Sequence, residues 1–253
     1  LDEDFCFEEF ADRVAELAEK HVNINRLLEL TKPVATAVVP ISAGRHIYKR
    51  EPSFPIAVAC DPAFNFVYEA NIRYLHHLGE VTYFSPLADT SLPDAGFVYL
   101  PGGYPELYLA ALSANRQMLQ SIRRYVESGG KLLAECGGMM YLCDEIRDKN
   151  GDVYPMAGVL HQSATMENMK LRLGYRTLLY NETRLKGHEF HYSRLVEQQN
   201  PLPSCAVAYT AKGVETDTPL YHYKNVWAGY THLYWADPVG NEWFTKFVID
   251  GNT

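Results

Sequence analysis

Short apolar runs alternate with amphipathic stretches through the middle of the chain. The apolar runs predict buried strands and lie at residues 56–60, 81–84, 97–100 and 132–134. The amphipathic stretches predict helices and lie at residues 66–78, 105–114, 116–128 and 139–146. Strands that alternate with helices in this way pair into a parallel sheet with right-handed crossovers. The pattern therefore predicts an α/β fold with a mostly parallel central sheet flanked by helices.

The two ends of the chain have different patterns. Residues 7–30 have a helical period, and a connector with four prolines follows over residues 31–55. After about Gly151 the pattern predicts strands at 176–180, 190–194 and 205–209 and a last helix at 239–249. We therefore expect an extension with a linker over residues 1–53 and one domain over residues 54–253.

Composition and charge narrow the class of protein. The 253 residues are 47% hydrophobic and carry a net charge of −8, with a pI near 5.6. The chain is thus long and apolar enough to bury a substantial hydrophobic core, and its negative net charge disfavours nucleic-acid binding. Every apolar run is shorter than the ~20 residues that span a bilayer, and the start is charged, so we expect a cytoplasmic protein without a membrane partner. Five cysteines without a Cys-x-x-Cys pair indicate reduced thiols and no metal site.

Cys136 stands where a buried strand meets two glycines. Residues 132–134 supply the strand, and Gly137 and Gly138 permit a sharp turn into the predicted helix. A thiol at a helix N-terminus faces unpaired N–H groups and the positive end of the helix dipole, which favour the thiolate. Cys136 is therefore a candidate nucleophile, although a cysteine that only fills core space fits this stretch equally well.

A second glycine pair follows another predicted strand, in the segment Pro-Gly-Gly-Tyr-Pro-Glu at 101–106. Ligands of open α/β sheets gather at the carboxyl ends of strands, so both glycine turns are expected at one pocket. There the N–H groups of Gly103 and Gly137 would hold the oxyanion that forms when Cys136 attacks a carbonyl. Taken singly, each glycine pair also fits an ordinary turn.

His232 is the candidate base for this thiol. It lies in the apolar segment 227–235, far from Cys136 in sequence, and a late strand would have to bring it back beside the nucleophile. It would take the proton of Cys136 and return it to the leaving amine. A histidine among aromatic residues is also a common structural residue.

Four blocks in fixed order carry a resemblance to a known family. They are Pro-Gly-Gly-Tyr-Pro-Glu at 101–106, Ala-Glu-Cys-Gly-Gly-Met-Met-Tyr-Leu at 134–142, Gly-His-Glu-Phe-His-Tyr-Ser at 187–193 and Gly-Tyr-Thr-His-Leu-Tyr at 229–234. Over about residues 54–250 the chain resembles the C-terminal glutaminase domains of the cobyrinate a,c-diamide synthase family. The upstream segment resembles the tail of that family's ATP-using domain.

The resemblance implies a flavodoxin-like class I glutamine amidotransferase fold. It implies Cys136 as nucleophile and His232 as the residue that raises its nucleophilicity. Most members of the wider superfamily carry a glutamine four residues after the cysteine and a glutamate two residues after the histidine. Here these positions hold Met140 and Tyr234, as in the branch that works with a Cys-His dyad. Glu135 and Glu189 are then the acidic candidates for orienting the imidazole, and each also fits a structural role.

The resemblance also implies the partners. Glutamine is the expected substrate of this domain, and its ammonia would serve an ATP- and magnesium-dependent half that amidates a corrinoid. No phosphate-binding loop of the Gly-x-x-x-x-Gly-Lys-Ser/Thr type occurs in the chain, so no cofactor is expected in this domain. Tyr104, His188 and His191 are candidates for the glutamine pocket. The odd spacing of the two histidines points them to opposite faces of a strand, which disfavours joint metal binding.

Two other functions fit the residues. A cysteine hydrolase of the same fold would use the same thiol and imidazole on a different acyl group. A non-catalytic flavodoxin-like module would use the glycine turns to bind a ligand, and its Cys136 would be no more reactive than Cys60 or Cys205.

Overall fold

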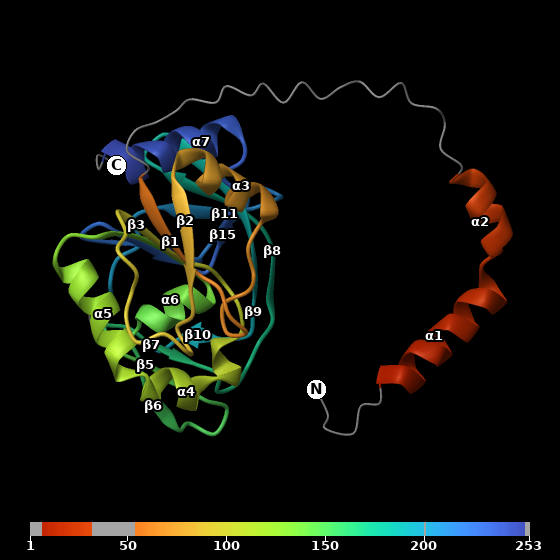
Figure 1. Cartoon of the computed structure of the whole chain (residues 1–253), viewed down its shortest axis with the longest axis horizontal. Coiled ribbons are helices and arrows are strands. Elements are labelled where there is room, and N and C mark those ends of the chain that lie inside the picture. The colour runs from red at the N-terminus through yellow and green to blue at the C-terminus, as the bar shows by residue number, and fades with distance from the viewer. Residues whose placement is uncertain (1–6, 32–53, 200, 251–253) are drawn as a thin grey trace. The chain divides into compact units, whose positions relative to one another are not determined.

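The computed structural model describes residues 7–31, 54–199 and 201–250 (Figure 1). The chain divides into two compact units, Leu1–Arg50 and Glu51–Thr253. The first contains helices α1 (Phe7–His21) and α2 (Ile24–Leu30). The sequence predicted one helix here, but the Asn23 side chain accepts the Arg26 N–H at 2.9 Å and begins a second helix. No helix among the described residues is both long and apolar enough to cross a membrane.

The second unit is built on a six-stranded sheet with the order β13-β14-β4-β3-β1-β2. Its strands are β1 (Pro55–Ala59), β2 (Glu80–Phe84), β3 (Phe97–Leu100), β4 (Lys131–Glu135), β13 (Leu220–Tyr223) and β14 (Val226–Gly229). All neighbours pair in parallel except β13, which runs antiparallel to β14. The mostly parallel central sheet predicted from the sequence is thus confirmed.

Helices cover both faces of this sheet, which explains why its inner strands β3 and β14 are buried along their whole length. The helices are α3 (Glu69–Leu78), α4 (Leu109–Ala114), α5 (Arg116–Glu127), α6 (Gly137–Leu142) and α7 (Pro238–Thr245), with short turns at Pro105–Leu107 and Lys246–Asp250. Val98 and Leu132 pack on the core face that also holds Met118 and Ile122 of α5. The opposite core contains Leu75 of α3 and Phe244 of α7.

Two smaller sheets complete the unit. An antiparallel five-stranded sheet has the order β12-β11-β8-β9-β15, and a four-stranded sheet has the order β10-β7-β5-β6. The strands of the first are β8 (Arg172–Tyr180), β9 (Thr183–His191), β11 (Val207–Thr210), β12 (Glu215–Thr216) and β15 (His232–Leu233). Those of the second are β5 (Glu145–Arg147), β6 (Val153–Pro155), β7 (Ser163–Thr165) and β10 (Arg194–Leu195). The antiparallel sheet brings β9 against β15.

Several predicted boundaries were wrong, and hydrogen bonds to distant segments explain them. The helix expected over 139–146 ends at Leu142, because Asp144 donates its N–H to Gln162 O and the chain enters β5. The helix expected from Phe66 begins at Glu69, because the Phe66 N–H donates to Gly102 O. The strand expected over 190–194 is divided between β9 and β10.

Candidate active site

Cys136 forms a strained turn between β4 and α6. Its backbone dihedrals are φ 47° and ψ −105°, a region that L-residues rarely occupy. The Cys136 N–H donates to Gly229 O of β14 at 2.8 Å, which anchors the turn to the sheet. A Cβ on Gly138 would lie 2.1 Å from Leu100 O, so this position requires glycine. The backbone therefore holds the cysteine in a strained turn beside the end of β3.

The loop after β3 packs directly against this turn. β3 and β4 are neighbours, with Leu100 paired to Ala134, so their following loops emerge side by side. A Cβ on Gly137 would lie 3.2 Å from Gly103 N and 2.7 Å from Pro105 Cδ. The structure thus brings Gly103 against Gly137. Gly137 is the first residue of α6, and an N–H at that position has no acceptor within the helix.

His232 reaches the same place because β14 is the other neighbour of β4. The chain leaves β14 at Gly229 and enters β15 at His232, which pairs with His188 of β9. A Cβ on Gly102 would lie 2.1 Å from His232 Cε1, so the imidazole edge rests on the glycine loop. The three segments that the sequence singled out therefore meet at one edge of the central sheet.

The candidate site is a cavity of about 280 Å³. Its lining residues are Phe66, Gly103, Tyr104, Cys136, His188, Phe190 and His232. Five of the seven residues named as candidates from the sequence line it, and a sixth, Gly137, is next to Cys136. The seventh, His191, lines a small adjoining hollow of about 20 Å³ that is also bordered by Cys136.

Aromatic and imidazole rings hold His232 in place. The rings of His188 and His232 stack with centroids 5.1 Å apart, and Phe66 packs against His232 at 4.5 Å. The Tyr68 hydroxyl lies 2.6 Å from His188 Nδ1. His232 Nδ1 is buried and has no hydrogen-bond partner among the residues that the structure describes. Within the described residues the imidazole is therefore positioned by stacking rather than by an acid.

No hydrogen bond or ion pair of the described residues joins either acidic candidate to the imidazole. Glu135 accepts the Leu233 N–H at 3.0 Å and the Tyr99 hydroxyl at 2.6 Å, so it fixes the backbone that follows His232. Its burial raises the pKa of the Glu135 carboxyl to about 8. Glu189 pairs with Arg176 instead. Both carboxylates therefore act on the scaffold around the base.

The electrostatics oppose a resting thiolate, contrary to the sequence-based expectation. Burial, followed by the negative charge of Glu106, raises the pKa of the Cys136 thiol to about 12, and the Gly137 N–H lowers it only in part. Burial also lowers the pKa of His232 to about 3. The helix dipole is weak here because α6 has only six residues. The site therefore rests as a neutral thiol beside a neutral imidazole, and the thiol lies 4.0 Å from Phe190 O.

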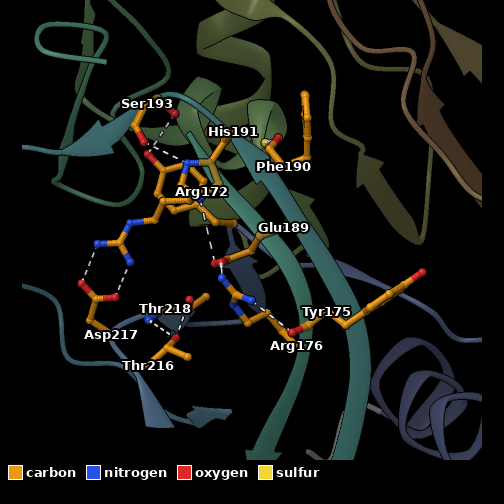
Figure 2. Close-up of polar contacts among 12 residues, drawn as sticks. Arg172, Tyr175, Arg176, Glu189, Phe190, His191, Ser193, Thr216, Asp217 and Thr218 are labelled. Atoms are coloured by element: carbon orange, nitrogen blue, oxygen red, sulfur yellow. Dashed lines mark hydrogen bonds and ion pairs between the residues drawn. The ribbon is translucent and has the colours of Figure 1, made fainter. Parts of the chain in front are cut away.

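A buried ion pair between Arg176 of β8 and Glu189 of β9 links these two neighbouring strands (Figure 2). Arg176 Nη2 lies 2.6 Å from Glu189 Oε2, and their side chains are 9% and 1% exposed. Burial alone would raise the pKa of Glu189, but hydrogen bonds from His191 and Thr218 and the charge of Arg176 lower it overall. His191 stacks on Tyr230 at 3.8 Å, whereas His188 faces His232, so the two histidines pack against different partners.

Removing Arg176 is expected to destabilise the domain. Arg176→Met would leave Glu189 buried without its cation, at a cost of about 3 kcal/mol in the free energy of unfolding. Because the pKa of Glu189 is lowered, this difference exists at neutral pH and disappears as the pH falls through the folded-state pKa. Urea denaturation measures it. The matched control is Arg172→Met, which breaks an exposed pair with Asp217 and should cost at most about 1 kcal/mol. Equal losses for the two variants would contradict the prediction.

Some cavity residues were not assigned from the sequence. Phe66 lies ahead of α3, where the pattern suggested a helix, and nothing local indicated that it would line the cavity and pack against His232. Tyr68, whose hydroxyl contacts His188 behind the cavity lining, was not assigned either. Phe190 and Glu106 lie inside two of the singled-out blocks, so their motifs were the available signal.

The sheet order and the turn that carries Cys136 define the class of fold: the domain has the class I glutamine amidotransferase fold. Two solved structures share that fold at a TM-score of 0.50 and 16% sequence identity. One is PurLQS from Thermotoga maritima, aligned over 78% of this chain and 96% of its own. The other is described as a glutamine amidotransferase, aligned over 76% of this chain and 98% of its own.

The chain belongs to the family of CobB/CobQ-like glutamine amidotransferase domains, whose model matches residues 55–239. Among curated proteins it is 37% identical over 236 residues to the cobyrinate a,c-diamide synthase of Picrophilus torridus, covering 88% of this chain and 49% of that protein. It is also 37% identical over 235 residues to the hydrogenobyrinate a,c-diamide synthase of Pseudomonas aeruginosa, covering 90% and 52%. The chain thus spans about half the length of these relatives.

Proposed function

We propose that this chain is the glutaminase half of a cobyrinate a,c-diamide synthase. The observation that carries the proposal is the strained turn that presents Cys136 to a cavity shared with His232. The names of the two relatives suggest the wider reaction, because one is a cobyrinate and the other a hydrogenobyrinate a,c-diamide synthase, and this chain matches about half the length of each. Ammonia released here would amidate the a and c carboxylates during cobalamin biosynthesis.

The proposed chemistry uses Cys136 and His232 as a dyad. His232 takes the thiol proton as Cys136 attacks the side-chain amide carbon of glutamine, and the N–H groups of Gly103 and Gly137 hold the oxyanion. His232 then gives the proton to the departing ammonia, which leaves a thioester on Cys136. Water activated by His232 cleaves the thioester to glutamate. Tyr104 and His188, which line the cavity, would confine the substrate.

The partner half would supply ATP, magnesium and the corrinoid site. We propose that residues 1–53 are the tail of that half and its linker, whereas residues 54–253 need no cofactor of their own. The exposed apolar side chains of Val14, Leu17 and Leu28 on α1 and α2 support this division. Exposed apolar side chains on a helix are typical of a helix that packs against another part of a protein.

Labelling with the glutamine analogue 6-diazo-5-oxo-norleucine tests the proposal. The full-length protein is expected to take up one equivalent at Cys136, as located by mass spectrometry, and free glutamine should prevent the labelling. The same protein should release glutamate from glutamine. Labelling of Cys60 or Cys205 to the same extent would favour the non-catalytic module, and hydrolysis of simple esters in preference to glutamine would favour the cysteine hydrolase.

A further inference from the structure

Glu106 is an acidic side chain beside the nucleophile that the proposed chemistry does not use. It follows the second glycine turn and is half-buried at the start of the helical turn Pro105–Leu107. It lines the 20 Å³ hollow together with Gly103 and Cys136. The hollow adjoins the main cavity, because Cys136, Tyr104 and Phe190 border both.

No cation neutralises this carboxylate within the part of the chain that the structure describes. The lining of the hollow contains no Lys or Arg, and no ion pair of the described residues includes Glu106. The one lining residue of the hollow that could become a cation is His191, whose Nδ1 lies 2.9 Å from Ser193 O. The pKa of Glu106 is raised by burial, and its own backbone N–H offsets this in part. A half-buried acid without a partner costs stability unless a ligand supplies the partner.

The same charge also acts against the nucleophile. Burial is the main cause of the raised pKa of Cys136, and the charges of three acidic residues raise it further. Glu106 has the largest effect of the three, ahead of Glu135 and Glu189. The histidines of the main cavity, His188 and His232, have lowered pKa values because of burial, so they do not offset the charge of Glu106. Within the described ranges of the chain, the Gly137 N–H is the one group that lowers the pKa of Cys136.

We propose that Glu106 binds the α-ammonium group of glutamine and that this pairing activates Cys136. The inference rests on the proposed function, since it assigns a role within the same site. A hollow of about 20 Å³ has the size of one water-sized group, which an ammonium is, and the 280 Å³ cavity beside it has room for the rest of the substrate. Once the ammonium neutralises Glu106, its opposition to the thiolate ends, so only the correct substrate relieves the charge that restrains the thiol.

Two substrates and one variant test the role. The full-length protein is assayed for ammonia release from glutamine and from glutaramate, which has the same amide and carboxylate but lacks the α-amino group. The wild type should prefer glutamine by about 10- to 100-fold in kcat/KM, the value of a charge-assisted hydrogen bond. Glu106→Gln should lose most of this preference, because its kcat/KM for glutamine should fall while its kcat/KM for glutaramate stays unchanged or rises. Glu127→Gln, at an exposed acid paired with Lys224, should keep it.

The reactivity of the Cys136 thiol gives an independent test, because the Glu106→Gln change should increase this reactivity while it decreases glutamine binding. Without the charge of Glu106, the pKa of Cys136 should fall, so Glu106→Gln should react faster with iodoacetamide at pH 7 while it binds glutamine more weakly. A merely structural role for Glu106 would not change the two quantities in opposite directions.

The outcomes are distinguishable. Wild-type protein that releases ammonia from neither amide contradicts the proposed function itself. Wild-type protein that hydrolyses both amides equally well overturns the role of Glu106 without any variant, so misfolding of Glu106→Gln cannot rescue the inference. Equal losses on both amides in a folded Glu106→Gln protein overturn it as well and leave the glutaminase assignment intact.

Discussion

Cys136→Ala is expected to lower the rate of glutamine hydrolysis by at least about 10⁴-fold while the domain stays folded. We expect a loss of this size because the variant cannot form the thioester: without the thiol, the base has no nucleophile to activate and no oxyanion forms for the N–H donors to stabilise. Alanine has the same Cβ as cysteine and fills the same strained backbone position, so the packing of the turn against β3 and β14 is retained. The measurement is glutamate release by the full-length protein, with far-UV circular dichroism as the check on folding.

A cysteine outside the cavity provides the control. Cys205 is half-buried and its thiol lies 3.1 Å from Leu220 O, away from the candidate site. Cys205→Ala should therefore hydrolyse glutamine at nearly the wild-type rate. If the full-length protein also carries the amidation activity, Cys136→Ala should retain it with free ammonia as the nitrogen source. A folded Cys136→Ala variant with normal glutaminase activity would show that the thiol is not the nucleophile.

His232→Ala is expected to reduce kcat by about 10²- to 10⁴-fold, which is the usual contribution of a general acid–base residue. The reason is the state of the resting site. Burial raises the pKa of the Cys136 thiol to about 12, so few thiolates form spontaneously at neutral pH and proton transfer to a base is needed. Because the pKa of His232 is lowered to about 3, the imidazole is neutral and able to accept that proton above about pH 4.

The pH profile separates this role from a structural one. Wild-type kcat/KM should show no acid limb from His232 near the ordinary histidine pKa. In His232→Ala the remaining activity should rise with pH, because hydroxide then has to remove the thiol proton. His222→Ala is the matched control, since that histidine stacks on Trp227 at 4.4 Å outside the cavity. An unchanged pH profile in His232→Ala would argue that the imidazole only packs.

Much of the site could be predicted from local patterns. The apolar strand before Cys136 and the glycines after it require a sharp turn at the end of a sheet strand, whatever the rest of the chain does. The same holds for the loop at 101–106. Parallel topology then predicted that the two loops lie at one edge of the sheet, and their glycines are in contact. The order of the four sequence blocks indicated the resemblance from which the class I glutamine amidotransferase fold was predicted.

The errors came from long-range hydrogen bonds and from burial. The long hairpin of β8 and β9 was predicted only in part, because its residues alternate weakly and gain their strand conformation from each other. The thiolate expected at a helix N-terminus does not form at rest, because desolvation and the charge of Glu106 exceed the effect of a short helix.

The sequence by itself determined the α/β class, the turn that carries Cys136 and the two glycine pairs, since each depends on residues close together in the chain. His232 was singled out through the resemblance of its block to a known family. The tertiary structure alone decided that His188 and Phe66 hold the imidazole, that Glu135 fixes the backbone after it, and that Glu106 faces the nucleophile. These features join segments as far apart in the chain as Phe66 and His232, and their strength depends on how much water is excluded between them. Neither the neighbours nor the burial can be read from local periodicity.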